Sequence, residues 1–230
     1  MAGVLWWDFD GTLVSRPAMW SEAGHMLLAE RCPHLGIQRD TLGRQLQTGF
    51  PWHDPELDHT RLATAEEWWD AVDHRFADAF VGLGWPEAHL ARPFVQLREC
   101  ILEPDRYRVF DDVEPVLSLL RDRGWRHVIV SNHVPELPSL VEALGLAGWF
   151  DAVVTSGRVG FEKPHPRLFE AARAVTPHGP IWMIGDNPVA DFAGARGVGI
   201  NAILVRTPHQ VSPRADDLWG VAAILDSQTS

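Results

Sequence analysis

The sequence predicts an α/β fold in which a Rossmann-like parallel sheet forms the core and an α-helical cap domain is inserted after the first strand. From residue 107 onward, helix-like segments alternate with short β-rich runs, which is typical of right-handed crossovers in a largely parallel sheet. Between residues 15 and 103 the alternating apolar pattern of strands is missing and helical periodicity replaces it. We therefore expect a core of residues 1–14 and 104–230 and a helical cap of residues 15–103.

The first core strand is the apolar run of residues 4–7, which ends at Asp8. Asp8 and Asp10 are two residues apart, and residues at i and i+2 of a strand project to the same side. Gly11 then permits a turn. An Asp-x-Asp-Gly string also occurs in ordinary turns, where it serves backbone geometry. At the carboxyl edge of an open α/β sheet, where ligands bind, two such carboxylates can share a metal and divide the chemical work.

The cap is expected to consist of helices over residues 20–30, 40–47, 65–80 and 86–102. It is rich in tryptophan, and burial in the cap core is the expected role of Trp68 and Trp69. Four other side chains of the insert are expected to face the cleft: Arg16, Trp20, Arg44 and Trp52.

The remaining core elements follow in alternation. Helices are expected over residues 113–123, 136–144, 166–175 and 188–196, and strands over residues 127–130, 152–155, 181–184 and 202–205. The tail after residue 226 is expected to be loosely ordered.

Polar residues follow three of these segments. Ser131 and Asn132 end one strand, Lys163 precedes a proline, and Asp186 ends another strand with Asp191 beyond it. Each alone has a structural explanation, since Ser-Asn can cap a helix, a lysine before proline is usually solvated, and Asp186 can cap the next helix. In this order, after the two aspartates, they resemble the haloacid dehalogenase-like (HAD) superfamily of phosphohydrolases. A helical insert just after the first strand resembles the C1 cap of that superfamily.

The resemblance implies a reaction at phosphorus. Asp8 matches the nucleophile that forms an aspartyl-phosphate intermediate. Asp10 matches the general acid that protonates the leaving oxygen and then takes a proton from the attacking water. Asp8, the backbone carbonyl of Asp10, and Asp186 match the metal ligands, and Mg²⁺ suits such oxygen ligands.

Other positions match the family's phosphate-binding groups. Thr12 lies where the phosphate is oriented, while the Ser131 hydroxyl and the backbone N–H of Asn132 can donate to phosphate oxygens. Lys163 matches the lysine that binds phosphate and offsets the charge of Asp8. Asp191 matches a supporting residue that holds metal-bound water or Lys163.

The leading hypothesis is therefore a Mg²⁺-dependent phosphatase of a small phosphorylated metabolite. A phosphomutase of the β-phosphoglucomutase type keeps the same motifs and cap, and stays open as an alternative. A non-catalytic phospho-acceptor module would use Asp8 as a switch, but the cap and Asp10 argue against it. A dehalogenase is disfavoured because a departing halide needs no proton and hence no acid at position 10.

Composition narrows the partners and the location. The chain of 230 residues has a net charge of −11 and 46% hydrophobic residues, which supports a real core and argues against binding to nucleic acid or an anionic membrane. Cys32 and Cys100 are expected to be buried thiols. No secretory signal or membrane-spanning stretch is legible, so a soluble cytoplasmic protein is expected. Among the histidines, His133 could approach a substrate, although a structural role is the commoner one.

Overall fold

The computed structural model describes residues 2–62, 64–87, 90 and 94–229. A six-stranded sheet forms the core, and all its neighbouring strands are paired in parallel. The strand order is β5-β4-β1-β6-β7-β8, so β1 lies inside the sheet. The strands are β1 (Gly3–Trp7), β4 (Trp125–Ser131), β5 (Ala152–Thr155), β6 (Ile181–Gly185), β7 (Asn201–Val205) and β8 (Arg214–Ala215).

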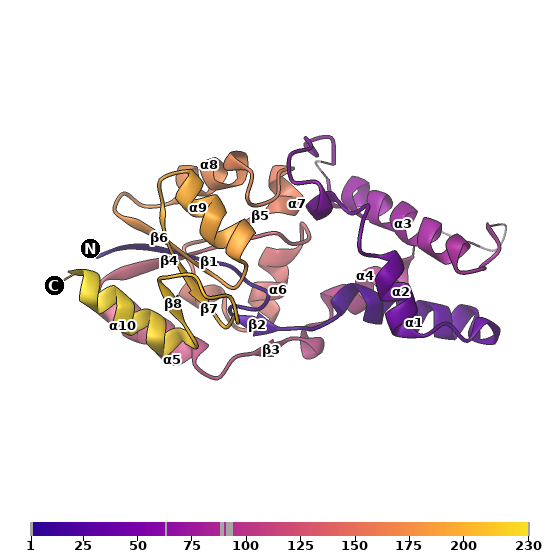
Figure 1. Cartoon of the computed structure of the whole chain (residues 1–230), viewed down its shortest axis with the longest axis horizontal. Helices are drawn as coiled ribbons and strands as arrows, with labels where there is room; N and C mark the ends of the chain where they lie inside the picture. Colours follow the sequence, from indigo (N-terminus) through magenta and orange to yellow (C-terminus); the bar gives the residue numbers. More distant parts are fainter. Residues whose placement is uncertain (1, 63, 88–89, 91–93, 230) are drawn as a thin grey trace.

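Helices cover both faces of this sheet (Figure 1). One face packs against α5 (Val113–Asp122), α6 (Leu137–Ala143) and α10 (Leu218–Thr229). The other packs against α8 (Pro166–Val175) and α9 (Gly194–Gly197). The side chains of β1 alternate between the two layers, with Leu5 and Trp7 facing the first and Val4 and Trp6 the second. A strand buried on both faces explains why the run before Asp8 is continuously apolar.

The structure follows the predicted alternation of helices and strands, adds the unpredicted β8 and α10 after β7, and differs from the prediction at three further points. Residues 188–196 form a π-helical turn (Pro188–Ala193) followed by α9 rather than one helix. The expected loose tail is wrong, because α10 continues to Thr229. Of the expected helix over residues 86–102, α4 (Val95–Leu102) is present, while residues 88–89 and 91–93 lie outside the described part of the chain.

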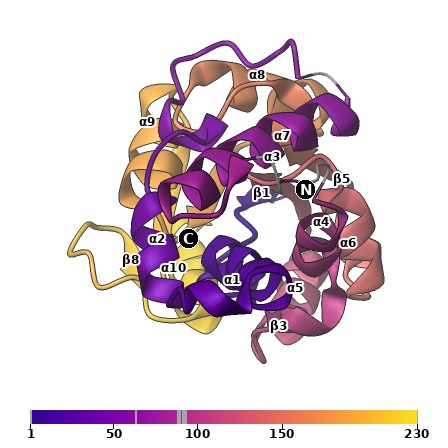
Figure 2. The same ribbon diagram turned by 90° about the vertical axis from the view of Figure 1, so that its right-hand side faces the viewer.

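The insert consists of helices that enclose their own apolar cluster. Besides α4, it contains α1 (Met19–Arg31), α2 (Arg39–Gln45) and α3 (Ala65–Gly82). Fully buried members of the cluster include Leu42, Phe76, Phe80 and Leu97. Figure 2 views the molecule from this end and shows the helices grouped in front of the core. Among the described residues, none of the helices combines the length and apolar character needed to cross a bilayer.

A two-stranded ribbon connects the insert to the core. The chain leaves the core through β2 (Val14–Ser15) and returns through β3 (Arg108–Val109), and these strands pair antiparallel. A second contact lies where the short helix α7 (Ser156–Val159) packs against α3. The Glu136 carboxylate also accepts a hydrogen bond from Trp69 Nε1 at 3.0 Å and forms an ion pair with Arg98. The carboxyl ends of β1, β4 and β6 therefore face the insert.

Candidate active site

The first element of the site is the loop that follows β1. Asp8 begins this loop, and its backbone N–H donates a hydrogen bond to the carbonyl of Ile184 on β6 at 2.9 Å. The chain then turns sharply, because Gly11 N–H donates to the carbonyl of Val14 at 2.8 Å. Gly11 has a φ of +76°, and a Cβ there would collide with the carboxylate of Asp186. Both the conformation and the close approach require glycine at this position.

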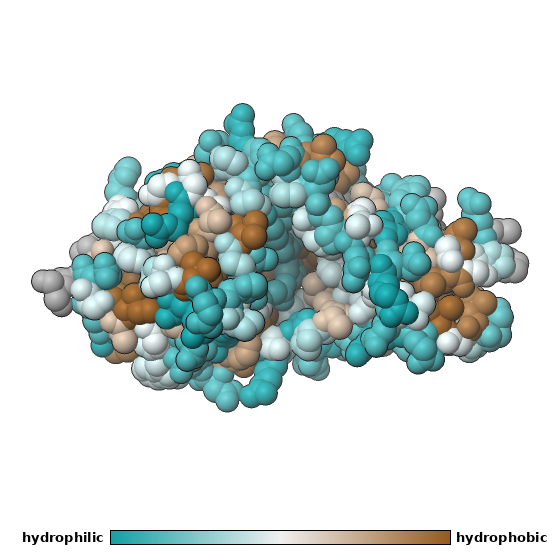
Figure 3. All heavy atoms as spheres, in the orientation of Figure 1, coloured by the Kyte–Doolittle hydropathy of each residue, from teal (hydrophilic) through white to brown (hydrophobic). Residues whose placement is uncertain are grey.

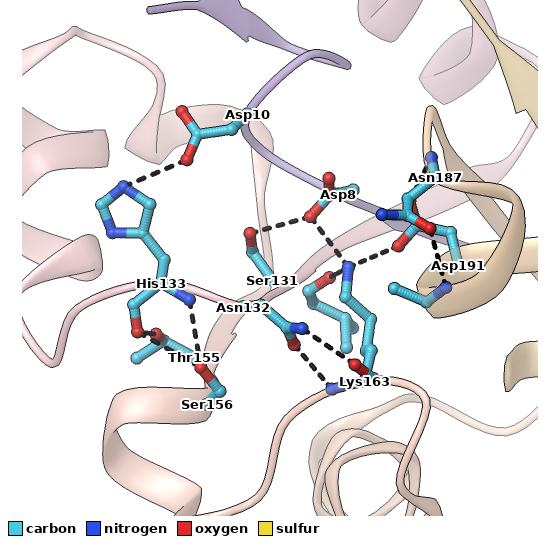
Figure 4. A network of polar contacts seen from close by, with 12 residues as sticks. Asp8, Asp10, Ser131, Asn132, His133, Thr155, Ser156, Lys163, Asn187 and Asp191 are labelled. Atoms are coloured by element: carbon cyan, nitrogen blue, oxygen red, sulfur yellow. Dashed lines mark hydrogen bonds and ion pairs between the residues drawn. The ribbon is translucent and has the colours of Figure 1, made fainter. Parts of the chain in front are cut away.

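Lys163 lies at the electrostatic centre of the site. Its ammonium donates to Asp8 Oδ1 at 2.8 Å, to Asp191 Oδ1 at 2.6 Å and to the carbonyl of Val130 at 2.8 Å. The residue is only 3% exposed. Burial alone would lower the pKa of Lys163, but the charges of Asp191 and Asp8 outweigh it and raise that pKa. Lys163 is therefore a buried cation held by two carboxylates (Figure 4).

The end of β4 positions both Asp8 and Lys163. Ser131 donates from its hydroxyl to Asp8 Oδ1 at 2.8 Å. The Asn132 side chain accepts from the backbone N–H of Lys163 at 2.6 Å and donates to its carbonyl at 3.0 Å. The Asn132 side chain thus holds the lysine loop, a contact that the sequence did not predict. Its backbone N–H stays the group expected to meet phosphate.

The π-helical turn after β6 presents Asp191. The Asn187 side chain accepts from the backbone N–H groups of Val189 and Ala190, which caps the turn. Asp191 Oδ2 accepts from the N–H of Asn187 at 3.0 Å, while its Oδ1 accepts from Lys163. The wider turn therefore brings a buried carboxylate back under the site, which is a common use of π-helical turns. Of the two expected partners of Asp191, the structure shows the lysine.

Asp10 has a different environment from Asp8. Figure 4 shows its carboxyl turned toward His133, with Oδ2 3.4 Å from Nε2 of the imidazole. Its Oδ1 is buried without a hydrogen-bond partner among the described residues. Loss of hydration, together with the charges of Asp8 and Asp186, raises the pKa of Asp10 to about 7. A carboxyl group with this pKa can carry a proton at neutral pH.

His133 supports this arrangement from below. Burial lowers its pKa to about 4, so the imidazole is neutral at pH 7. Its backbone is fixed by β5 and α7, because its carbonyl accepts from Thr155 Oγ1 at 2.6 Å and its N–H donates to Ser156 Oγ at 3.1 Å. The sequence suggested only that His133 could approach a substrate, and it did not predict the contact with Asp10.

The donor set fits a hard divalent cation. Carboxylate oxygens of Asp8, Asp186 and Asp191 all lie within 4.8 Å of one another. Burial raises the pKa of Asp186 to about 6, and the neighbouring charge of Asp8 adds to the rise. Lys163 supplies one positive charge to this region, and oxygen ligands of this kind suit Mg²⁺. The Asp10 carboxyl is outside the cluster, and metal contact through its backbone carbonyl stays a prediction.

A cavity of about 370 Å³ opens above these groups, between core and insert. In Figure 3 the surface is hollowed between the two lobes. Trp20 and Trp52 line the cavity as expected, together with Asp10 and Lys163. Sequence reasoning missed other apolar lining residues, among them Met19 and Val134, because such residues have no chemical signature.

Three other predicted residues lie elsewhere. Arg16 lies beside an adjoining cavity that it shares with Asp10, and its guanidinium donates to the carbonyl of Cys100 at 2.9 Å. Arg44 is exposed on α2 and bonds to Thr41, and it does not line the main cavity. Thr12 is fully buried beside the loop, and its hydroxyl has no hydrogen-bond partner among the described residues.

Comparison with known proteins places this geometry in a family. The model of the haloacid dehalogenase-like hydrolases matches residues 4–199. The chain is 34% identical over 194 residues to haloacid dehalogenase-like hydrolase domain-containing protein 3 from Bos taurus, which covers 81% of this chain and 76% of that protein. The chain therefore belongs to the haloacid dehalogenase-like hydrolase family.

Two further similarities are informative. The chain is 41% identical over 107 residues to phosphoserine phosphatase from Thermus thermophilus, which covers 45% of this chain and 43% of that protein. The fold is similar to that of the magnesium-bound HAD hydrolase YfnB from Bacillus subtilis, with a TM-score of 0.70 and 20% identity. That similarity covers 97% of this chain and 98% of the other.

Proposed function

We propose that the protein is a Mg²⁺-dependent phosphatase that hydrolyses a small phosphorylated metabolite through an aspartyl-phosphate on Asp8. The observation that carries the proposal is the pairing of Asp8, held by Lys163, with Asp10, whose pKa is raised to about 7. Such a pair offers a nucleophile and a proton donor two residues apart. The similarity to a phosphoserine phosphatase supports reaction at phosphorus.

In the first half of the reaction, a carboxylate oxygen of Asp8 attacks phosphorus and the bond between phosphorus and the leaving oxygen breaks. The proton of the Asp10 carboxyl passes to that oxygen, so the product leaves as an alcohol. Lys163 and Ser131 hold the Asp8 carboxylate in place during the attack. This positioning lowers the entropic part of the barrier.

In the second half, Asp10 is a carboxylate and accepts a proton from a water molecule that attacks phosphorus. The bond between Asp8 and phosphorus breaks, inorganic phosphate forms and both aspartates return to their starting states. The Asn132 backbone N–H donates to the phosphate oxygens, and the positive charge of Lys163 lies beside them on Asp8. These donors stabilise the charge that spreads over the phosphoryl group.

Asp8, the backbone carbonyl of Asp10, and Asp186 would hold Mg²⁺. When bound, the ion reduces the repulsion between the Asp8 carboxylate and the phosphate dianion. Asp191 acts through Lys163, because its carboxylate accepts from the ammonium at 2.6 Å.

The test is phosphate release from a panel of phosphorylated metabolites with Mg²⁺ and with EDTA. We expect release from the natural protein with Mg²⁺ only, and at least a thousand-fold loss in Asp8→Asn, whose circular dichroism spectrum should be unchanged. Unchanged release by Asp8→Asn would overturn the mechanism. Isomerisation of a sugar phosphate without accumulation of inorganic phosphate would identify a mutase, and a stable aspartyl-phosphate without turnover would identify a phospho-acceptor module.

The role of Asp10 needs its own comparison. In Asp10→Asn we expect a large loss with alkyl phosphates and a much smaller loss in the first step with 4-nitrophenyl phosphate, whose leaving group departs without a proton. A burst of nitrophenol followed by slow turnover would show that the second step still needs Asp10. Equal losses with both kinds of ester would contradict a role in protonating the leaving group.

A further inference from the structure

The wall of the catalytic cavity formed by the insert is aromatic. Trp20 and Trp52 both line the cavity, and their ring centroids are 4.9 Å apart with planes inclined by 26°. Phe50 is stacked on Trp52 at 4.4 Å, with planes inclined by 7°. The two indoles are half-buried, so they are held by neighbouring rings and still reach the cavity. Such a wall offers a rigid, polarisable apolar surface.

This wall begins beside the general acid. Met19 and Trp20 line the main cavity together with Asp10, and the same three residues also line the adjoining cavity next to Arg16. In the proposed reaction, Asp10 protonates the leaving oxygen, so the leaving group must lie near it. The surface next to Asp10 therefore contacts the leaving group rather than the phosphate.

The opposite wall, formed by the core, is also apolar. Val189, on the π-helical turn, is 62% exposed and lines the cavity, as do Pro164 and Ala190. An apolar side chain left in water at the mouth of a site gains free energy when a ligand covers it. The cavity volume of about 370 Å³ lies at the lower end of the range for small-molecule sites. It suits one ring-sized group beyond the phosphate.

The charges of the cavity disfavour a second anionic group on the substrate. Among the described residues that line it, Lys163 is the one lysine or arginine, and its ammonium already bonds to Asp8, Asp191 and a carbonyl. The Arg16 guanidinium is 1% exposed and bonds to backbone carbonyls of α4. A carboxylate on the leaving group would face Asp10 without a cation to pair with, which is costly in a partly dry site.

We propose that the preferred substrates are phosphate monoesters whose leaving alcohol carries an uncharged, apolar ring that packs between the Trp20 and Trp52 wall and Val189. This inference rests on the proposed phosphatase function and names its substrate class. It sets the protein apart from enzymes for amino-acid or carboxylate phosphates, because the leaving-group side lacks the cation that such substrates need.

The experiment compares kcat/KM for three esters with similar, unactivated leaving oxygens: 2-phenylethyl phosphate, ethyl phosphate and phosphoserine. Phosphate release is measured with Mg²⁺, and the Asp8→Asn protein serves as the blank. We expect 2-phenylethyl phosphate to exceed each of the other two by at least about ten-fold, as filling an apolar pocket allows. Equal values, or a preference for phosphoserine, would overturn the substrate class.

Two variants locate the effect. Trp52→Leu should lower kcat/KM for 2-phenylethyl phosphate about ten-fold and leave kcat/KM for ethyl phosphate nearly unchanged. The control is Trp219→Leu, which replaces a half-exposed tryptophan of α10 and should change neither value. Val189→Lys alters an exposed side chain and should shift the preference toward phosphoserine, even if Trp52→Leu fails to fold. A parallel fall with both alkyl esters in Trp52→Leu, or an unchanged preference in Val189→Lys, would contradict the inference.

Failure of the inference can be told from failure of the proposed function. If no ester is hydrolysed in an Asp8-dependent way, the phosphatase function itself is wrong. If hydrolysis depends on Asp8 and Mg²⁺ but shows no preference for the ring, the chemistry stands and the substrate class is wrong.

Discussion

Lys163 shows how single residues set the properties of this site. A lysine before a proline has no special meaning in a sequence, yet this ammonium lies between Asp8 and Asp191 and is almost completely buried. Burying three ionised groups is costly, and the cost is offset only while each charge keeps its partners. The same contacts that hold the Asp8 carboxylate therefore also determine local stability.

The residue-scale prediction concerns removal of that cation. Without Mg²⁺, Lys163→Met should lower the free energy of unfolding by about 3–5 kcal/mol, because two buried carboxylates lose their partner. Phosphatase activity should also be lost. Urea unfolding monitored by tryptophan fluorescence measures the first effect and phosphate release the second.

Arg126→Gln is the matched control. It removes the Arg126 guanidinium from a more exposed ion pair with Asp151, and this pair should contribute about 0–1 kcal/mol to the free energy of unfolding. Similar destabilisation by the two substitutions would show that the buried position of Lys163 has no special energetic importance.

At the scale of elements, the pairing of β1 with β4 places a histidine in the core. Trp7 Nε1 donates to His127 Nδ1 at 3.1 Å, which leaves Nε2 to carry the proton and donate to the carbonyl of Leu117 at 3.2 Å. Both contacts are satisfied only by the neutral ring. Burial lowers the pKa of His127 to about 4. A sheet buried between two helical layers thus holds an uncharged histidine.

This element predicts a pH dependence of stability. The pKa of His127 is lower in the folded than in the unfolded state, so between pH 6.5 and 4 the unfolded chain binds a proton that the folded one does not. The neutral His127 ring makes its full contribution to the free energy of unfolding above pH 6.5. That contribution falls by up to about 3 kcal/mol as the pH drops to 4. His127→Gln removes this titration.

The measurement is urea unfolding of the natural protein and His127→Gln at pH 7.5 and pH 4.5. At pH 7.5 the natural protein should have a higher free energy of unfolding than His127→Gln. The difference between the two free energies should be smaller at pH 4.5. Using the difference cancels the titration of other buried acids. A difference that stays constant would mean that His127 does not titrate differently in the two states.

The π-helical turn shows why one element escaped prediction. Residues 188–196 have the composition of a helix, and periodicity does not distinguish a π-helical turn from an α-helical one. The turn is decided by contacts at its start, where Asn187 caps it and Asp191 bonds back to the Asn187 N–H while reaching Lys163. The helix α10 also went unpredicted, although its buried residues Leu218, Val221, Ala222 and Leu225 have helical spacing.

At the scale of the whole molecule, the core and the insert meet over a concentration of negative charge. The chain carries a net charge of −11, and four carboxyl groups (Asp8, Asp10, Asp186 and Asp191) gather at the sheet edge beneath the insert. Their mutual repulsion opposes folding, and a bound cation would remove part of it. Metal binding should therefore be visible in the stability of the entire protein.

We expect Mg²⁺ at 10–100 times its dissociation constant to add about 1–3 kcal/mol to the free energy of unfolding, as a ligand of the folded state does. For a chain of this size, that corresponds to a rise of about 3–8 °C in Tm. EDTA should abolish the rise. Thermal unfolding followed by circular dichroism, with and without Mg²⁺, measures it.

The matched variants are Asp186→Asn, which should lose the Mg²⁺-dependent rise, and Asp122→Asn, an exposed acid of α5 that should keep it. An equal rise in both would mean that Mg²⁺ stabilises the protein through its overall charge rather than at the site.

The sequence by itself determined the order of the core strands and the residues that could take part in chemistry. Asp8, Ser131 and Asp186 could be found because each lies at the end of an apolar strand or directly after it, and the ends of parallel strands meet at one edge of the sheet. The family resemblance added Lys163, whose partners lie 155 and 28 residues away and have no local signal.

Only the tertiary structure decided the environments of these residues. The neutral imidazole beside Asp10, the Asn132 side chain that fixes the lysine loop, and the aromatic wall of the cavity all arise from contacts between distant segments. Periodicity and strand ends are local properties, so they can be read along the chain. Burial, charge coupling and cavity shape depend on which segments meet, and that is settled when the insert packs over the sheet edge.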